Sequence, residues 1–348
     1  MQTGREAVKR AIERKNPDRV PRMLDWFADE TIEKYGKGII DEIKDRYPDD
    51  IIMATLGKPY SFSPRTDAWY VDGVDEFGVK RIHAAGGVGL HRHSSKLDDI
   101  GYLDEYLEKD FPDPWAPGRF DRAKMLRERY PDRYIVGHWW QALFESVADL
   151  RGMENYLCDL IIDRDNIMRL ERKLCNFWKE VIKGFAESGM DGIFFSDDVG
   201  DQRSMILSPQ TWREVLKPLY REMIDVAHER GLHVLLHTCG NVKEIIPDII
   251  EAGFDAIHPI QPGCMNAREI AGMYRGKISF FGGIDVQNLL PNGTPEQVDR
   301  AMKDMMEIFN SPEGGFIAAP ANSIMPETPM ENIKALFEAV EKYSKSGK

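Results

Sequence analysis

The sequence predicts an α/β protein of the (β/α)8, or TIM-barrel, class. Short apolar runs alternate with amphipathic helical stretches from about residue 134 onward, two further apolar runs lie upstream, and several helical stretches carry recognisable caps. Strands that alternate with helices are typical of a parallel sheet, and eight of them can close a barrel. A barrel with insertions accommodates 348 residues, so we expect one domain over residues 1–348.

The predicted strands are short and rich in aromatic and branched apolar side chains. The helices between them have clear start and stop signals, because Ser208 and Thr294 are typical N-caps and Gly231 and Gly253 are typical residues after a helix end. The charged N-terminal segment predicts a further amphipathic helix, and residues 147–188 predict two helices. The eight strands are placed at residues 20–27, 51–56, 134–140, 192–196, 233–237, 255–260, 278–282 and 316–319.

Residues 57–133 do not follow the alternation of strands and helices. The stretch TDAWYVDGVDEFGVKRIHAAGGVGLHRHSS is typical of hairpin-like strands, and the polar, proline-rich stretch FPDPWAPGRF follows it. We therefore expect residues 57–133 to form an inserted hairpin and loop region over one end of the barrel.

Composition and charge favour a small-molecule enzyme. The formal net charge is -12 and no basic run is present, which argues against a nucleic-acid partner or an anionic membrane surface. No apolar stretch approaches the ~20 residues that span a bilayer, and the N-terminal segment lacks the apolar core of a signal peptide. We therefore expect a cytoplasmic protein with reduced thiols, and the sequence allows a homodimer.

Polar residues follow most of the predicted strands. In a parallel barrel the carboxyl ends of the strands meet at one shared mouth, so these residues are the natural candidates for a site. Asp and Asn at such positions also serve as ordinary helix N-caps. The candidates for catalysis are Glu145, Asp198 and Asp285, and those for substrate binding are Trp140, Gln261 and Asn322.

His237 and Cys239 form the sharpest local pattern. Two residues apart at a strand end, they present an imidazole nitrogen and a sulfur to the same side, and this donor pair favours zinc. Cys264 follows the next strand and is the candidate third ligand, although a free cysteine is also a common small core residue. His258 lies inside a strand run and is interpreted as a packed or hydrogen-bonded core residue.

Asp197 and Asp198 follow the strand at residues 192–196. Adjacent side chains on an extended chain diverge, so we expect Asp198 to face the mouth while Asp197 caps a helix or pairs with another group. A carboxyl group in a partly dry pocket can act as a general acid or bind a substrate by hydrogen bonds.

Several long blocks carry a resemblance to a known family. They are REAVKRAIERKNPDRVPR, FFSDDVGDQRSMILSPQTWREVLKPLYREMIDVAHERGLHVLLHTCGNVKEIIPDIIEAG, HPIQPGCMNAREI, FFGGIDVQNLLPNGTPEQV and APANSIMPETPMENI. Together they resemble the uroporphyrinogen decarboxylase superfamily along nearly the whole chain, most closely its corrinoid-dependent methyltransferase and O-demethylase branch. The resemblance implies a (β/α)8 barrel.

Two departures from the family pattern shape the predicted function. The Arg-Gln-Ala-Gly-Arg segment whose arginines hold substrate carboxylates in uroporphyrinogen decarboxylases is replaced here by RVPRMLD at residues 19–25. The similar methylcobamide:thiol methyltransferases bind zinc through His-x-Cys and a distant cysteine, and Asn322 stands where that cysteine is expected. Cys264, Glu145, Asp198 or His138 could complete another ligand set, or the site could be metal-free.

The resemblance therefore implies a zinc-dependent methyltransferase. It would move a methyl group between a small molecule, such as a methoxylated compound, a methylamine-like donor or a thiol, and the cobalt of a corrinoid. The sequence lacks the Asp-x-His-x-x-Gly cobalamin motif, so we expect a partner protein to supply the corrinoid (cobalamin). The alternatives are a decarboxylase of uroporphyrinogen or a related carboxylate, and a non-catalytic corrinoid or tetrapyrrole binder.

Overall fold

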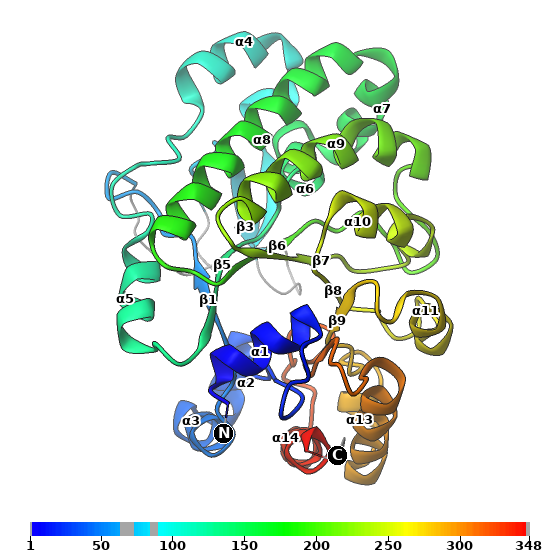
Figure 1. Cartoon of the computed structure of the whole chain (residues 1–348). Helices are drawn as coiled ribbons and strands as arrows, with labels where there is room; N and C mark the ends of the chain where they lie inside the picture. The colour runs from blue at the N-terminus through cyan, green and yellow to red at the C-terminus, as the bar shows by residue number, and fades with distance from the viewer. Residues whose placement is uncertain (1, 63–72, 84–89, 346–348) are drawn as a thin grey trace.

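A seven-stranded parallel sheet organises the molecule (Figure 1). The computed structural model describes residues 2–62, 73–83 and 90–345. The strands pair in the order β1-β5-β6-β7-β8-β9-β10. Their bounds are β1 (Ile51–Thr55), β5 (Tyr134–Trp139), β6 (Gly192–Ser196), β7 (His233–His237), β8 (Ala256–His258), β9 (Ser279–Phe281) and β10 (Phe316–Ile317).

Helices cover the outer side of the curled sheet, with α8, α9 and α10 on one side and α13 and α14 on the opposite side (Figure 1). Ser208 caps α9 and Thr294 caps α13, as predicted, and Gly253 ends α10. The helices are α1 (Gly4–Glu13), α2 (Asp29–Tyr35), α3 (Lys37–Arg46), α4 (Leu103–Glu105), α5 (Asp121–Arg129), α6 (Phe144–Arg151), α7 (Met153–Ile162), α8 (Arg164–Glu187), α9 (Pro209–His228), α10 (Ile246–Ala252), α11 (Ala267–Tyr274), α12 (Leu289–Asn292), α13 (Pro295–Phe309) and α14 (Met330–Ser344).

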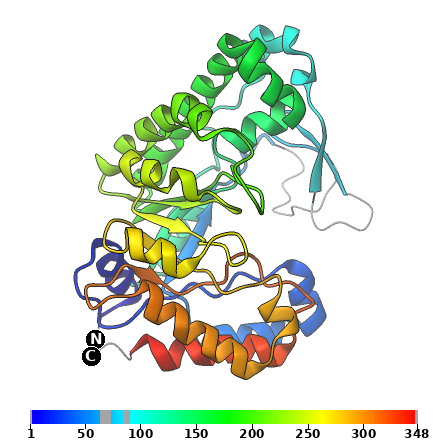
Figure 2. The ribbon, with the colours of Figure 1, turned by 90° about the vertical axis from the view of Figure 1, so that its right-hand side faces the viewer.

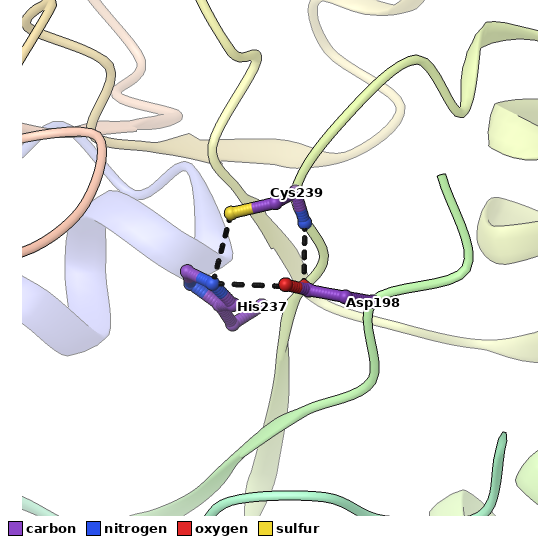
Figure 3. Close-up of side chains that lie close together, drawn as sticks. All are labelled: Asp198, His237 and Cys239. Carbon is purple, nitrogen blue, oxygen red and sulfur yellow. Dashed lines mark hydrogen bonds and ion pairs between the residues drawn. The ribbon is translucent and has the colours of Figure 1, made fainter. Parts of the chain in front are cut away.

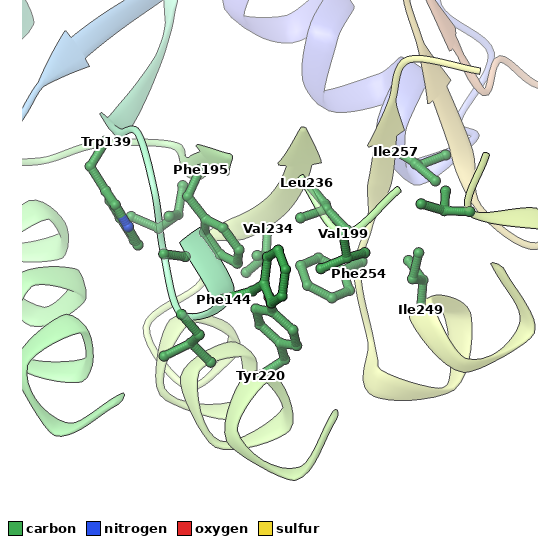
Figure 4. Close-up of a cluster of buried hydrophobic side chains, with 14 of the residues drawn as sticks. Trp139, Phe144, Phe195, Val199, Tyr220, Val234, Leu236, Ile249, Phe254 and Ile257 are labelled. Carbon is green, nitrogen blue, oxygen red and sulfur yellow. The ribbon is translucent and has the colours of Figure 1, made fainter. Parts of the chain in front are cut away.

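Alternate residues of each strand build two separate cores. One set, which includes Trp139, Phe195 and Leu236, packs against the helices, and Figure 4 shows these side chains in one cluster with Tyr220 of α9 and Ile249 of α10. The other set packs on the opposite face of the sheet, as expected when both faces of a parallel sheet are buried. It contains Val8 and Ile12 of α1 together with Tyr134, Val136, Phe194, Leu235, Ala256, Phe281 and Ile317.

Helix α1 covers the amino-terminal ends of the strands. Its Ala11 carbonyl accepts a bond from the Gly315 N–H, just before β10, and its Ile12 carbonyl accepts one from the Ser279 hydroxyl at the start of β9. The backbone N–H of Arg5 bonds to the Asp132 carbonyl just before β5. The opposite, carboxyl ends of the strands are therefore left for the site.

The predicted strand at residues 20–27 is present only as isolated bridges. Arg22 pairs with Ala318 beyond β10, and its carbonyl accepts the Asp50 N–H just before β1. Pro21 has no N–H to donate, and the N–H of Arg22 bonds to the Asp50 carboxylate instead of a strand. The N–H groups of residues 24 and 25 bond to the Asp49 carboxylate in the same way. The seven-stranded curled sheet is established, whereas the closed eight-stranded barrel stays a prediction.

The insertion contains the predicted hairpin-like strands. A small antiparallel sheet joins β2 (Gly73–Val74), β3 (Lys80–His83) and β4 (Leu90–Ser94), while residues 63–72 and 84–89 lie outside the described residues. Figure 2 shows these strands projecting from the side of the parallel sheet. At the end of the predicted insertion, α5 packs against β1 and β5, so it belongs with the helices that cover the main sheet.

The segment between β5 and β6 differs from the sequence prediction in the number of helices. Two helices were expected over residues 147–188, and three are present, because Gly152, with a φ of 81°, separates α6 from α7. Asp163 then separates α7 from the long helix α8. Within the described ranges, no helix combines the length and apolar character needed to cross a membrane.

Candidate metal centre

Three histidines lie on the inner face of the sheet at the carboxyl ends of neighbouring strands. The inner-core residues Val136, Leu235 and Ala256 are followed two positions later by His138, His237 and His258, which therefore face the same side. All three imidazoles are buried, and burial lowers the pKa of each one, to about 3 for His138. The inner core thus ends in neutral imidazole groups at the open end of the sheet.

Asp198, His237 and Cys239 bring three different donor atoms together (Figure 3). His237 Nε2 lies 3.3 Å from Cys239 Sγ and 3.7 Å from Asp198 Oδ1. All three donor atoms lie within 4.8 Å of one another, and no other group of this kind occurs in the described part of the chain. The sequence pattern His-x-Cys therefore forms a cluster with a carboxylate from the neighbouring strand β6.

The two distances that His237 Nε2 makes to the other donor atoms suit a zinc ion. Ligands of a tetrahedral zinc ion at about 2.0 to 2.3 Å are separated from each other by about 3.3 to 3.8 Å. The distances from His237 Nε2 to the sulfur and to the carboxylate oxygen match this range. Imidazole, thiolate and carboxylate are all ordinary zinc ligands, so these residues could hold zinc with a fourth position left open.

The two aspartates after β6 take the separate positions that their divergence predicts. Asp197 is buried and accepts bonds from the backbone N–H groups of residues 143, 144 and 145 at 2.8 to 2.9 Å, so it caps the start of α6. Burial raises its pKa to about 6, although the bond from Tyr220 opposes this effect. Asp198 instead accepts the Cys239 N–H at 2.7 Å and lies in the cluster.

Cys239 is held by its loop and by Asn322. The amide Nδ2 of Asn322 donates to Cys239 Sγ at 3.5 Å, so Asn322 lies next to the proposed ligands. Burial raises the pKa of the Cys239 thiol well above its ordinary value, and the Asp198 carboxylate adds to this effect. In the absence of a cation the sulfur is therefore a neutral thiol.

Glu145 at the start of α6 lies close to the cluster. Its carboxyl group accepts a bond from the Ser196 hydroxyl at 3.1 Å, and Ser196 stands beside His237 in the sheet register. Burial raises the pKa of Glu145 well above its usual value, and the Asp198 and Asp197 carboxylates raise it further. Burial and the neighbouring carboxylates thus both favour the protonated form of this carboxyl group.

Aromatic rings form one wall beside the cluster. Trp140 lies 4.5 Å from the His138 ring and 5.9 Å from the His237 ring, measured between centroids. Trp26, from the N-terminal segment, lies 5.8 Å from Trp140 and stacks on His258 at 5.0 Å. The predicted substrate-binding residue Trp140 is thus next to the candidate metal ligands.

The other predicted residues take different positions. Gln261 accepts the Gly240 N–H at 2.6 Å and so holds the loop that follows Cys239. Asp285 accepts N–H bonds from Gln287 and from residue 288, which makes it part of its own turn. Cys264 is partly buried and does not belong to the cluster of three donors, so its role as a ligand stays a prediction.

The interpretation of His258 as a packed or hydrogen-bonded core residue is confirmed, because its ring is buried and both of its nitrogens have polar contacts. His258 Nδ1 lies 2.8 Å from His237 Nδ1, and its Nε2 lies 3.0 Å from the Pro320 carbonyl oxygen. In the structure both histidines end consecutive strands, β7 and β8, and the parallel register places them side by side.

Fold and cluster together define an α/β protein with a candidate metal centre at the carboxyl ends of a curled parallel sheet. Residues 95–343 match the family model described as "Uroporphyrinogen decarboxylase (URO-D)". The chain therefore belongs to the uroporphyrinogen decarboxylase family.

Curated relatives with similar sequences include methyltransferases of methanogens. The chain is 26% identical to a methylated-thiol–coenzyme M methyltransferase of Methanosarcina mazei over 242 residues, covering 70% of this chain and 61% of that protein. It is 28% identical to the methylcobamide:CoM methyltransferase MtaA of Methanosarcina barkeri over 233 residues, covering 65% of this chain and 64% of that protein. The chain thus spans less than two thirds of the length of these relatives.

A solved structure shares the whole fold. The match to a methyltransferase from Methanosarcina mazei has a TM-score of 0.74 at 18% identity, and it covers 99% of each chain.

Proposed function

We propose that the protein is a zinc-dependent methyltransferase that moves a methyl group between a small molecule and the cobalt of a corrinoid carried by a partner protein. The observation that carries this proposal is the convergence of Asp198, His237 and Cys239 at the carboxyl ends of the strands. The similarity to methylcobamide:CoM methyltransferases supports the same reaction class.

Asp198, His237 and Cys239 would hold the zinc ion. Bound there, zinc would supply a Lewis acid that lowers the pKa of a thiol or polarises an ether oxygen. The chain prepares the site in two ways, because Asp198 fixes the Cys239 backbone and Asn322 donates a hydrogen bond to the Cys239 sulfur. Cys264 would take part only if its loop moved toward this cluster.

The ligand set favours an oxygen-containing substrate. A carboxylate from Asp198 and a single thiolate make a harder set of donors than one imidazole with two thiolates. A harder set suits an oxygen ligand better than a sulfur ligand. We therefore favour a methoxylated compound as the methyl donor over a thiol or a methylamine-like compound.

Glu145 fits the proton transfer that such a donor requires. When the methyl group leaves a methyl ether, the carbon–oxygen bond breaks and the departing oxygen must gain a proton. Burial raises the pKa of Glu145, which favours the protonated form of its carboxyl group, and this group would supply that proton. Trp140 would line the position of the substrate beside the cluster.

Zinc content and methyl transfer test this function together. Protein purified without chelator and supplied with zinc should bind about one zinc ion per chain, measured by mass spectrometry of the metal. It should also convert cob(I)alamin to methylcobalamin with an aryl methyl ether as donor, followed by absorbance. A Cys239→Ala variant should lose both zinc and turnover, because one of three ligands is gone.

Other outcomes would point to the alternatives. A metal-free protein that converts uroporphyrinogen would support the decarboxylase, and a protein that binds cobalamin without turnover of any methyl donor would support the non-catalytic binder. If methyl-coenzyme M is formed from methylcobalamin while methyl ethers are inert, the preference for an oxygen substrate is wrong. A wild-type protein that binds no zinc contradicts the proposed metal centre.

A further inference from the structure

His258 connects the candidate metal centre to the backbone of the loop after β10. Its ring is fully buried between Trp26, which stacks on it, and the edges of Phe194 and Phe281. Its two nitrogens are nevertheless both used, because Nδ1 lies 2.8 Å from His237 Nδ1 and Nε2 lies 3.0 Å from the Pro320 carbonyl oxygen.

The carbonyl of Pro320 decides where the protons lie. A carbonyl oxygen can only accept, so His258 must carry its proton on Nε2. A neutral imidazole has one proton, and burial among aromatic rings favours the neutral form, so His258 Nδ1 is an acceptor. The contact at 2.8 Å then requires His237 to donate from its own Nδ1. His237 Nε2 is left with a free lone pair.

That lone pair faces the other donors of the cluster, since His237 Nε2 is the atom that lies 3.3 Å from Cys239 Sγ. Without His258, the carboxylate of Asp198, at 3.7 Å, would favour a proton on Nε2, and the nitrogen could no longer bind a metal. Hydrogen bonds to the far nitrogen of a ligating histidine commonly fix its tautomer.

We propose that His258 is a positioning residue that holds His237 in the tautomer with Nδ1 protonated and Nε2 free for the metal. The inference rests on the proposed metal centre. It also links both ligands to one loop, because Pro320 anchors His258 and Asn322, two residues later, donates to the sulfur of Cys239. The bond from the Ala321 N–H to the Ile284 carbonyl holds this loop in place.

The tautomer can be measured in the absence of zinc. Long-range 1H–15N correlation spectra of protein labelled in its histidine rings should show His237 with a proton on Nδ1 and none on Nε2. In His258→Phe, which keeps a ring beside Trp26, and in His258→Leu, which offers no acceptor to His237, the proton should move to Nε2. His233→Phe, at the other end of β7, is the matched control and should leave the His237 signals unchanged.

Zinc affinity gives a second readout. His258→Phe and His258→Leu should weaken zinc binding about 10- to 100-fold in competition with a chromophoric chelator. A His237 signal with the proton on Nε2 in the wild type, or an unchanged tautomer in the folded His258 variants, would overturn the inference. If the spectra show the expected tautomers and the wild type binds no zinc, the proposed metal centre is wrong, while the role of His258 in fixing the tautomer of His237 is confirmed.

Discussion

Asp197 and Asp198 are adjacent in sequence and perform different tasks. The Asp198 carboxylate lies among the proposed zinc ligands, whereas Asp197 accepts three backbone N–H bonds at the start of α6. The strand before them directs successive side chains to opposite faces, which explains the separation. The same substitution at each position therefore makes a matched pair.

Asp198→Asn should weaken zinc binding at least about tenfold with little change in stability, because Asn can still accept the Cys239 N–H but has no charge for the metal. Asp197→Asn should lower the free energy of unfolding by about 1 to 3 kcal/mol, because one acceptor oxygen of the cap is lost. Zinc titration and denaturant unfolding measure the two effects. Equal losses of zinc affinity in both variants would contradict the assignment.

At the scale of elements, the loop after β7 is shaped by its close contact with the loop after β6. Gly240 has a φ of 83°, and a Cβ atom there would lie 2.4 Å from the Gly200 carbonyl oxygen. Gly240 directly follows Cys239, so the contact constrains the backbone next to the proposed sulfur ligand. Gly231 has a φ of 72°, and a Cβ atom at that position would meet nothing within 4 Å, which makes it a control for backbone strain alone.

Gly240→Ala should destabilise the protein by about 2 to 4 kcal/mol and weaken zinc binding, because backbone strain and a clash with backbone atoms add together. Gly231→Ala should cost only about 1 kcal/mol and leave zinc binding unchanged. Chemical unfolding and zinc competition compare the two. Similar losses in both would mean that the two loops move apart at little cost.

A second element-scale feature is the buried contact between α7 and α8. Glu171 of α8 is fully buried and accepts a bond from the Tyr156 hydroxyl at 2.5 Å, while its other oxygen has no partner among the described residues. Burial raises the pKa of Glu171 to about 8 from an ordinary value of 4.5. The folded state therefore binds this proton more tightly than the unfolded chain does.

The pH dependence of stability follows from that shift. Because the folded pKa is raised, the wild type should lose stability as pH rises from about 4.5 to about 8, by up to about 1.4 kcal/mol per pH unit from this group. Glu171→Gln removes this loss, so its stability relative to the wild type should grow across the same interval. Unfolding curves at pH 5 and pH 8 test this, and a constant difference between the two proteins would contradict the shift.

At the scale of the whole molecule, the sequence predicted what local patterns control. Seven strand positions, the caps at Ser208 and Thr294 and the pairing of His237 with Cys239 follow from periodicity and residue type. Contacts between segments that are distant in the sequence were harder to predict. The bond between His258 and the Pro320 carbonyl depends on how β8 and the loop after β10 approach each other, which no local pattern reports.

The absence of a regular strand at residues 20–27 also results from contacts between segments that are distant in the sequence. Residues 20–27 are apolar enough to resemble a strand, but the backbone N–H groups of residues 22, 24 and 25 bond to the carboxylates of Asp49 and Asp50. The Met23 N–H keeps a strand-like bond to the Ala318 carbonyl. Those aspartates are 24 to 28 residues away along the chain, so the competition is invisible in a local window. Measurements of the stability of the whole protein can test whether residues 20–27 join β1 to β10.

Asp50 lies where residues 20–27 contact the start of β1. It is fully buried, its two carboxylate oxygens lie 2.5 and 2.6 Å from the Arg19 guanidinium, and one of them also accepts the Arg22 N–H. Arg22 contacts both edges of the sheet. It forms a bridge to Ala318 after β10, and its carbonyl oxygen accepts the Asp50 N–H just before β1. The segment thus contacts the sheet at both ends of the strand order.

If this segment closes the sheet, Asp50→Asn should destabilise the entire molecule. Removing the charge leaves Arg19 without its buried partner, so the free energy of unfolding should fall by about 3 kcal/mol. Hydrogen exchange should show the loss at the backbone amides of Met23, Ala318 and the substituted position 50, and equally in the central strands β6 and β7, since a closed sheet opens as a unit. Faster exchange confined to residues 20–27, with unchanged protection of β6 and β7, would show that the segment is only an appendage on an open sheet.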